Sequence, residues 1–416
     1  MNANRLDQII GNNPDQLTVQ PRMGFSDQNT MRHGLESVQF LGPPVVATIT
    51  VDAMTRQGLV EEAAEAVRRG DTLNGYPIAS YSSQENRRLL DKISHDGFPI
   101  QVRHGTPLPM HIFRATAEAG LDALEGGPVS YCLPYSRVPL VDAIDAWRKA
   151  SRYWATEAQE MLGRVTHLES FAGCMMGQLC NPSLLVALGI LEGYFFVENG
   201  ITSLSLSYAQ GTNHDQDVGA LLALRQLAGE YFHSESLHIV LYTWMGVFPH
   251  SAAGAKKLIV DSARLAVIGK ARRLIVKTTA EAFGIPTIAD NLNALRWARE
   301  AAQVSFDEQA SGVSLAWQEE IYEEARELVE AVLSLNADIG QALSKAFANG
   351  FLDVPYCLHR DNANRARAYI DPDSGEIRWQ DSAGLAFRRR IGGASALPMT
   401  SKALLNALSF YQIRYA

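Results

Sequence analysis

Cysteine is scarce in this sequence, and its scarcity narrows the classes of protein to consider. The 416 residues contain four cysteines, which are unpatterned and show no zinc-site spacing. We therefore expect reduced thiols in a cytoplasmic protein. The four residues are Cys132, Cys174, Cys180 and Cys357.

Long apolar runs and an excess of positive charge are also missing. The apolar stretch 258–277 is interrupted by Asp261, Arg264 and Lys270, so we expect no transmembrane span. The first residues, MNANRLDQIIGNN, lack the basic and apolar regions of a signal peptide. The net charge of −8 disfavours nucleic acid and anionic membranes as partners.

What the sequence does contain is a regular alternation of strand-like and helix-like segments. Short apolar or β-branched runs are separated by helical stretches such as 57–70 and 217–233. This alternation is typical of a parallel sheet, and eight units within about 260 residues predict a (β/α)8 TIM barrel over residues 1–300. An open, doubly wound sheet is the alternative. The eight runs are 17–21, 45–50, 99–103, 127–132, 165–171, 201–208, 237–242 and 273–278.

After residue 300 the pattern changes, and we expect a C-terminal α+β extension over residues 301–416. A long amphipathic helix is predicted at 314–336, packed on the barrel or on a partner. A hairpin is predicted at 369–381, with its turn at Asp373–Gly375. The basic stretch 387–393 is interpreted as a solvated or partner-facing patch. The apolar stripe of the helix consists of Leu315, Tyr322, Ala325, Val329 and Val332.

Three arginines follow the first three predicted strands. Active sites of such barrels lie at the carboxyl ends of the strands, where Arg22, Arg56 and Arg103 are expected. A buried cation needs an anion, and guanidinium groups bind carboxylates through two parallel hydrogen bonds. The three side chains together predict a site for a dicarboxylate. The alternative is that each arginine pairs locally, for example with Asp52 or Glu125.

Other polar residues near strand ends give weaker signals. Glu125 could hold a substrate ammonium or act as a base, and Gly126–Gly127 after it suggests close approach of a ligand to the backbone. Lys277 and Glu281 could form an ordinary ion pair. Buried tyrosines such as Tyr131 and Tyr135 more often satisfy their hydroxyl while packing. We expect structural roles for His104, His167, His214 and His250.

Seven motifs, in order and at similar spacing, give the sequence a family resemblance over residues 17–390. It resembles the catalytic large (epsilon) chain of glutamate mutase, also called methylaspartate mutase. The motifs are QPRMG (20–24), TVDAMTRQ (50–57), LNGYP (73–77), RHGTP (103–107), EGGPVSYCLPY (125–135), WMGVFP (244–249) and IVKTTAEAFGIPT (275–287).

The resemblance implies a (β/α)8 barrel that uses adenosylcobalamin to interconvert L-glutamate and (2S,3S)-3-methylaspartate by a radical rearrangement. By motif position, the arginines would bind the substrate carboxylates and Glu125 its ammonium group. The other matches are Tyr131, Tyr135 and Phe171 beside the substrate, Gly24, Asn74 and Met245 on the cofactor side, and Lys277 and Glu281 at the adenosyl ribose.

The resemblance also implies a partner. The cobalt-binding motif Asp-x-His-x-x-Gly is absent from the sequence, so a separate small subunit is expected to carry it, and no metal ligand is expected in this chain. The implied assembly is a heterotetramer with a homodimer of large chains. Two alternatives stay open: the same scaffold acting on a substituted glutamate-like dicarboxylate, and a non-catalytic binding subunit.

Overall fold

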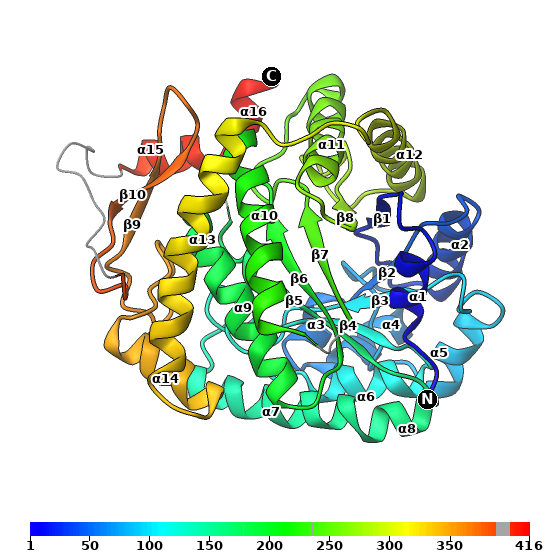
Figure 1. Cartoon of the computed structure of the whole chain (residues 1–416). Helices are drawn as coiled ribbons and strands as arrows, with labels where there is room; N and C mark the ends of the chain where they lie inside the picture. Colours follow the sequence, from blue (N-terminus) through cyan, green and yellow to red (C-terminus); the bar gives the residue numbers. More distant parts are fainter. Residues whose placement is uncertain (178, 234–235, 388–399) are drawn as a thin grey trace.

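Eight parallel strands form a barrel at the centre of the molecule (Figure 1). The computed structural model describes residues 1–177, 179–233, 236–387 and 400–416. Neighbouring strands pair in sequence order around the sheet, and the Val46 amide donates to the Val19 carbonyl at 3.1 Å, which joins β2 to β1. The barrel prediction is therefore confirmed, and the open-sheet alternative is wrong. The strands are β1 Thr18–Pro21, β2 Ala47–Thr50, β3 Ile100–Arg103, β4 Ala123–Gly126, β5 His167–Ser170, β6 Ser203–Ala209, β7 Ser236–Tyr242 and β8 Arg273–Val276.

The fourth strand lies earlier in the chain than predicted. The segment 127–132 is not a strand; β4 is Ala123–Gly126, directly before it. The strand contains a glutamate and a glycine, which strand propensity disfavours. The apolar run after it turns instead, because Gly126 has a φ of +134° and the Glu192 carboxylate accepts hydrogen bonds from the backbone of Val129 and Ser130.

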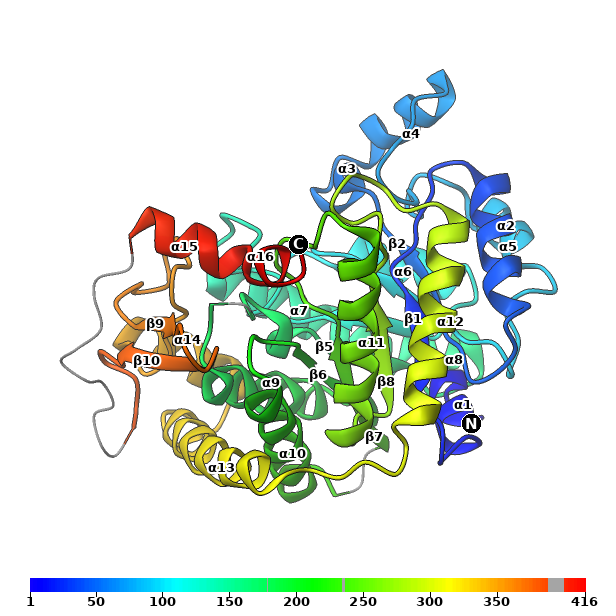
Figure 2. The same ribbon diagram turned by 90° about the horizontal axis from the view of Figure 1, so that it is seen from above.

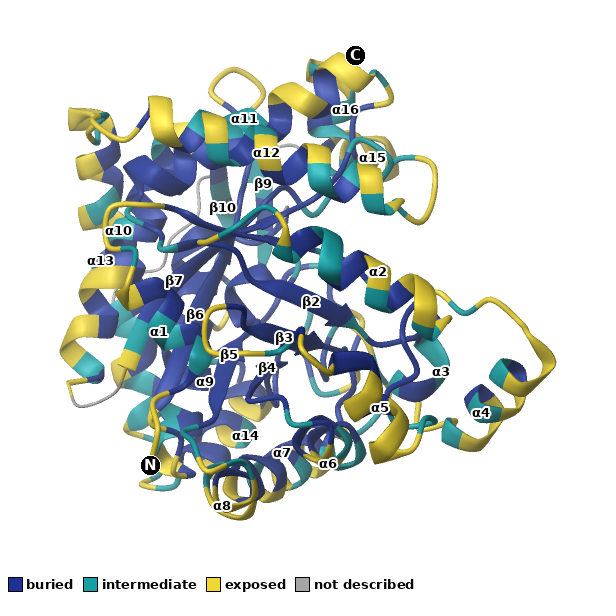
Figure 3. Cartoon of the chain, turned by 90° about the vertical axis from the view of Figure 1, so that its right-hand side faces the viewer, coloured by how far each residue is buried: buried dark blue, intermediate teal, exposed yellow. Residues whose placement is uncertain are grey.

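Helices cover the outside of the barrel, so the strands inside this layer of helices are almost wholly buried (Figure 3). The helix α9 is apolar all round because it lies between the barrel and a further helix. In Figure 2, α4 extends away from the body of the barrel. No helix in the described ranges is long and apolar enough to cross a membrane. These helices are α1 Arg5–Gly11, α2 Gln28–Gln39, α3 Ala53–Arg56, α4 Val60–Arg69, α5 Ser83–Leu90, α6 Met110–Glu118, α7 Leu140–Ala155, α8 Glu157–Leu162, α9 Pro182–Glu198, α10 His214–Tyr231, α11 Ala252–Ile268 and α12 Ile288–Val304, with a 3-10 turn at Ala172–Cys174.

The C-terminal extension has the predicted α+β composition and packs on the barrel. The long helix α13 lies along α9 and α10, so its apolar face packs on the outer helices of the barrel (Figure 1). Four residues of its predicted stripe are buried, but Leu315 is 51% exposed and Trp317 faces α10 instead. A straight helix drifts relative to a seven-residue repeat, which turns this end of the stripe away from α10. The elements are α13 Gly312–Leu333, α14 Ile339–Asn349, β9 Arg367–Ile370, β10 Ile377–Asp381, α15 Ser401–Leu408 and α16 Phe410–Arg414.

The predicted hairpin is formed by β9 and β10, which pair antiparallel. Its turn is tied to the loop after β6, where the Thr212 hydroxyl donates to the Gly375 carbonyl at 2.5 Å. The domain boundary at residue 300 stays a prediction; α12 runs to Val304. Most of the basic stretch 387–393 lies outside the described residues.

Candidate active site

A cavity of about 790 Å³ opens at the carboxyl ends of the strands. It receives side chains from the loops after β1 to β5 and β7, which the barrel topology brings to one end. The predicted site residues that line it are Arg22, Asn74, Arg56, Arg103, Glu125, Tyr131, Tyr135, Phe171 and Met245.

The three arginines converge because their strands are neighbours in the barrel. Arg103 ends β3, Arg22 directly follows β1, and Arg56 ends the short helix α3 after β2. The Asp52 carboxylate begins α3 by accepting from the Met54 and Thr55 amides. Asp52 therefore caps the helix, and Arg56 forms no salt bridge with any residue that the structure describes. Burial lowers the pKa of Arg56, as expected for a cation that lacks a close anion.

Local pairing, the alternative considered from the sequence, applies to Arg103. Its Nε donates to Glu125 Oε2 at 2.6 Å, and both side chains are buried. Although burial acts in the opposite direction, the Glu125 carboxylate raises the pKa of Arg103 well above its ordinary value. The Nη groups of Arg103 make no hydrogen bond within the described part of the chain. One edge of this guanidinium is therefore occupied by Glu125, and the other stays available to an anion.

Arg22 is held more loosely. Its Nη1 lies 3.9 Å from Glu281 Oε2, and its buried Nε has no hydrogen-bond partner among the described residues. Glu281 also lies 3.5 Å from Lys277 Nζ. Burial lowers the pKa of Lys277 to about 8, with Glu281 opposing this effect. Lys277 and Glu281 thus lie next to Arg22, although neither lines the cavity itself.

Glu125 is the centre of a buried hydrogen-bond network. Its Oε1 accepts from the Tyr131 hydroxyl, and its Oε2 accepts from Arg103 and from the Tyr242 hydroxyl, the latter at 2.7 Å. Burial and the neighbouring Glu125 raise the pKa of Tyr131 well above its ordinary value, so this phenol stays a hydrogen-bond donor. Sequence reasoning missed Tyr242, which is the last residue of β7 and follows apolar residues that indicated a buried strand only.

The double glycine after Glu125 serves packing within the protein. A Cβ on Gly127 would lie 2.0 Å from the Glu192 carboxylate, and one on Gly126 would meet Trp147 at 2.5 Å. Glu192 accepts from Ser130 and Ser170 as well as from the backbone, and burial raises its pKa to about 7. The suggestion of a ligand approaching this backbone is therefore corrected: the close group is Glu192.

Gly24 also owes its small size to packing. A Cβ there would lie 2.3 Å from the Thr50 carbonyl, at the end of β2. Gly24 is absent from the residues that line the cavity. The missing Cβ thus allows the chain after β1 to run close to the end of β2.

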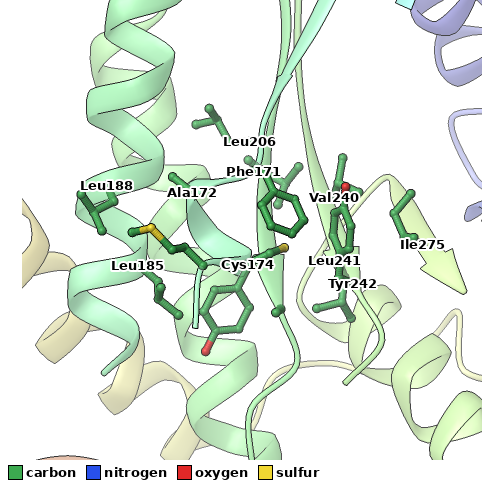
Figure 4. Close-up of a cluster of buried hydrophobic side chains, with 14 of the residues drawn as sticks. Phe171, Ala172, Cys174, Leu185, Leu188, Leu206, Val240, Leu241, Tyr242 and Ile275 are labelled. Carbon is green, nitrogen blue, oxygen red and sulfur yellow. The ribbon is translucent and has the colours of Figure 1, made fainter. Parts of the chain in front are cut away.

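An aromatic wall closes one side of the cavity. The Phe171 ring lies 5.3 Å from the Tyr131 ring, measured between ring centroids. Its centroid lies 5.5 Å from that of Tyr242, and Figure 4 shows these two side chains next to each other. Tyr135 lies further out, 6.4 Å from Phe171 and 55% exposed. The wall therefore runs from buried Tyr131 and Phe171 to an exposed rim at Tyr135. Tyr242 lies behind Phe171, outside the cavity lining.

His104 lines the cavity too, although the sequence indicated a structural role. Its ring stacks on Trp147 with the centroids 5.7 Å apart, and its buried Nε2 has no hydrogen-bond partner among the described residues. Burial lowers the pKa of His104 well below its ordinary value, so the ring is neutral. Its position directly after Arg103 at a strand end was the available signal. Thr106, His111 and Arg137 also line the cavity and were not predicted.

The residues expected on the cofactor side provide polar and apolar groups. The Asn74 side-chain oxygen accepts from the Ala53 amide, and Met245 is half-buried in the loop after β7. Together with the Lys277–Glu281 pair, this set suits a ligand with amide, hydroxyl and apolar parts. Among residues 1–177, 179–233, 236–387 and 400–416, no group of three or more His, Cys, Asp and Glu could hold a metal.

Comparisons with known proteins agree with this architecture. The family described as Methylaspartate mutase E chain (MutE) matches residues 4–406. The glutamate mutase epsilon subunit of Haloarcula marismortui is 32% identical over 382 residues, which cover 90% of this chain and 77% of that protein. That of Escherichia coli O157:H7 is 33% identical over 357 residues, covering 82% of this chain and 73% of that protein. The chain therefore belongs to the methylaspartate mutase E chain family.

Proposed function

We propose that this chain is the catalytic subunit of an adenosylcobalamin-dependent mutase that interconverts L-glutamate and (2S,3S)-3-methylaspartate. The observation that carries the proposal is the charge pattern of the cavity. Arg22, Arg56 and Arg103 line it together with Glu125, which is the one carboxylate among the described lining residues. Arg137 adds a further cation. An amino dicarboxylate has the complementary pattern, two negative groups and one positive group.

The arginines would bind the two substrate carboxylates. Arg56 has no salt bridge within the described residues, Arg22 has a distant one, and Arg103 has two Nη groups without partners there. Three guanidinium groups at or after the ends of neighbouring strands can hold both ends of a small diacid, which fixes its carbon skeleton relative to the protein.

Glu125 would accept a hydrogen bond from the substrate ammonium. Its Oε1 has one protein donor, Tyr131, and so retains capacity for a second. Tyr131 holds this oxygen in place, while Phe171 and Tyr135 cover the substrate with apolar surface and exclude water.

Asn74 and Met245, which line the cavity, and the neighbouring Lys277 and Glu281 would hold the cofactor. Asn74 and Met245 would contact the corrin and Lys277 and Glu281 the adenosyl ribose, and Gly24, packed against the end of β2, would lie on the cofactor side. When bound, adenosylcobalamin supplies the radical chemistry of the rearrangement. We expect a small subunit with Asp-x-His-x-x-Gly to provide the cobalt ligand, in a cytoplasmic heterotetramer.

Reconstitution tests the proposal. The purified chain is combined with the small cobalamin-binding subunit of a glutamate mutase and adenosylcobalamin, and L-glutamate conversion is followed by NMR. We expect turnover that requires all three components. A complex that binds the cofactor but converts neither L-glutamate nor (2S,3S)-3-methylaspartate contradicts the proposal, and turnover of a substituted glutamate instead identifies a different substrate.

A further inference from the structure

Tyr242 connects the candidate substrate site to the interior of the barrel. It is the last residue of β7, and its side chain is fully buried beside Phe171 (Figure 4). Its hydroxyl lies 2.7 Å from Glu125 Oε2 and also contacts Glu169 Oε1. A phenol has one proton, so this hydroxyl lies between two carboxylates that it cannot both serve fully at once.

Charged and polar side chains inside the barrel hold Glu169 in place. It lies on β5, and its Oε2 accepts from Arg273 on β8, from Gln101 at 3.2 Å and from Ser205 at 3.1 Å. All of these side chains are buried. Its Oε1 has Tyr242 as its contact, so a rigid ion pair inside the barrel determines where the Tyr242 hydroxyl lies.

The ring of Tyr242 supports Arg103 separately from its hydroxyl. The Arg103 guanidinium carbon lies 5.1 Å from the ring centroid, a cation–π contact. Removing the hydroxyl alone therefore leaves the surface under Arg103 intact. Replacing Tyr242 by phenylalanine therefore tests the hydrogen bond to Glu125 without removing the cation–π contact with Arg103.

We propose that Tyr242 is the positioning residue for ammonium recognition: its hydroxyl lies against Glu169, donates its single proton to Glu125 Oε2, and so fixes the Glu125 carboxylate in the orientation that accepts the substrate ammonium. This rests on the function proposed above. Without this hydroxyl, Glu125 keeps its hydrogen bonds from Arg103 and Tyr131 but loses the one from Tyr242. Recognition of the ammonium then weakens, whereas binding of the two carboxylates does not.

The test is Tyr242→Phe in the reconstituted holoenzyme, with affinities measured by calorimetry and by kinetics. The ligands are L-glutamate and glutarate, which has the same two carboxylates and no ammonium. We expect the affinity and kcat/KM for L-glutamate to fall about tenfold, the scale of one hydrogen bond to a charged group, and glutarate affinity to change less than twofold. Equal losses for both ligands, or no loss for either, overturn the inference.

A matched control and a double mutant separate positioning from a structural effect. Tyr322→Phe removes a tyrosine–carboxylate hydrogen bond of 3.0 Å to Glu230, between α13 and α10, and should change neither affinity. Glu125→Gln should abolish the preference for L-glutamate, and adding Tyr242→Phe to it should have no further effect. Additive losses contradict the inference. A wild-type enzyme that binds glutarate and L-glutamate equally contradicts the role of Glu125 itself, and with it both proposals.

Discussion

Replacing Arg103 by lysine tests the carboxylate-binding role most directly. Arg103 is 4% exposed and divides its guanidinium between Glu125, bonded through Nε at 2.6 Å, and the cavity, which its Nη groups can reach. Lysine keeps the charge but has a single nitrogen. It can remain with Glu125 or bind the substrate, and it cannot reproduce the two-point contact.

The expected cost follows from this loss. One hydrogen bond between charged partners is worth about 1.5–3 kcal/mol, which corresponds to about a 10- to 150-fold lower kcat/KM. The assay is L-glutamate turnover by the reconstituted enzyme, with a thermal melt to establish that the variant is folded. We expect the melting temperature to change far less than the activity, because the charge that balances Glu125 is retained.

The control is Arg148→Lys, the same substitution at an arginine that donates to Asp338 at 2.7 Å, on α7 and away from the cavity. Its kcat/KM should stay within about twofold of the wild-type value. If Arg103→Lys also keeps near-normal turnover, the function of Arg103 is to pair with Glu125, and its proposed binding of a substrate carboxylate is refuted.

Three further predictions concern stability. Gly127→Ala places a methyl group 2.0 Å from the Glu192 carboxylate, so urea denaturation should show a loss of about 3 kcal/mol, whereas Gly229→Ala, with open space around its Cβ, should show none. Burial raises the pKa of Glu192 from 4.5 to about 7, so between these pH values the folded protein binds a proton that the unfolded chain does not. The contribution of Glu192 to the free energy of unfolding therefore falls by about 3 kcal/mol as pH rises from 4.5 to 7. Glu192→Gln should remove this pH dependence. Burial lowers the pKa of Lys277 from 10.5 to about 8, so between these pH values the unfolded chain binds a proton that the folded protein does not. The free energy of unfolding therefore rises by about 3 kcal/mol between pH 8 and 10.5, and Lys277→Met should abolish that rise. If the pH dependence of stability is unchanged in the Glu192 or the Lys277 variant, that residue is not its source.

Most of the barrel was predictable because its signals are local. Seven of the eight predicted runs overlap observed strands, since short apolar runs between amphipathic helices indicate buried parallel strands wherever they occur. The fourth failed because Glu125 and Gly126 are poor strand formers. Their place in β4 depends on pairing with β5, in which Glu125 lies opposite Glu169. Pairing between strands more than 40 residues apart is not visible in a local pattern.

The sequence by itself determined that three arginines lie at or shortly after the carboxyl ends of the first three strands, because chain order fixes which residues follow each strand. Only the tertiary structure decided their partners. Arg103 meets Glu125 from the next strand, whereas Tyr242 meets the same carboxylate from 117 residues away. Gly127 similarly owes its identity to Glu192, a residue on a distant helix. The physical reason is that closure of the barrel brings together side chains from strands that are far apart in the sequence. Whether two such side chains form a hydrogen bond depends on their lengths and on their positions around the barrel, and the spacing of residues along the chain does not give these.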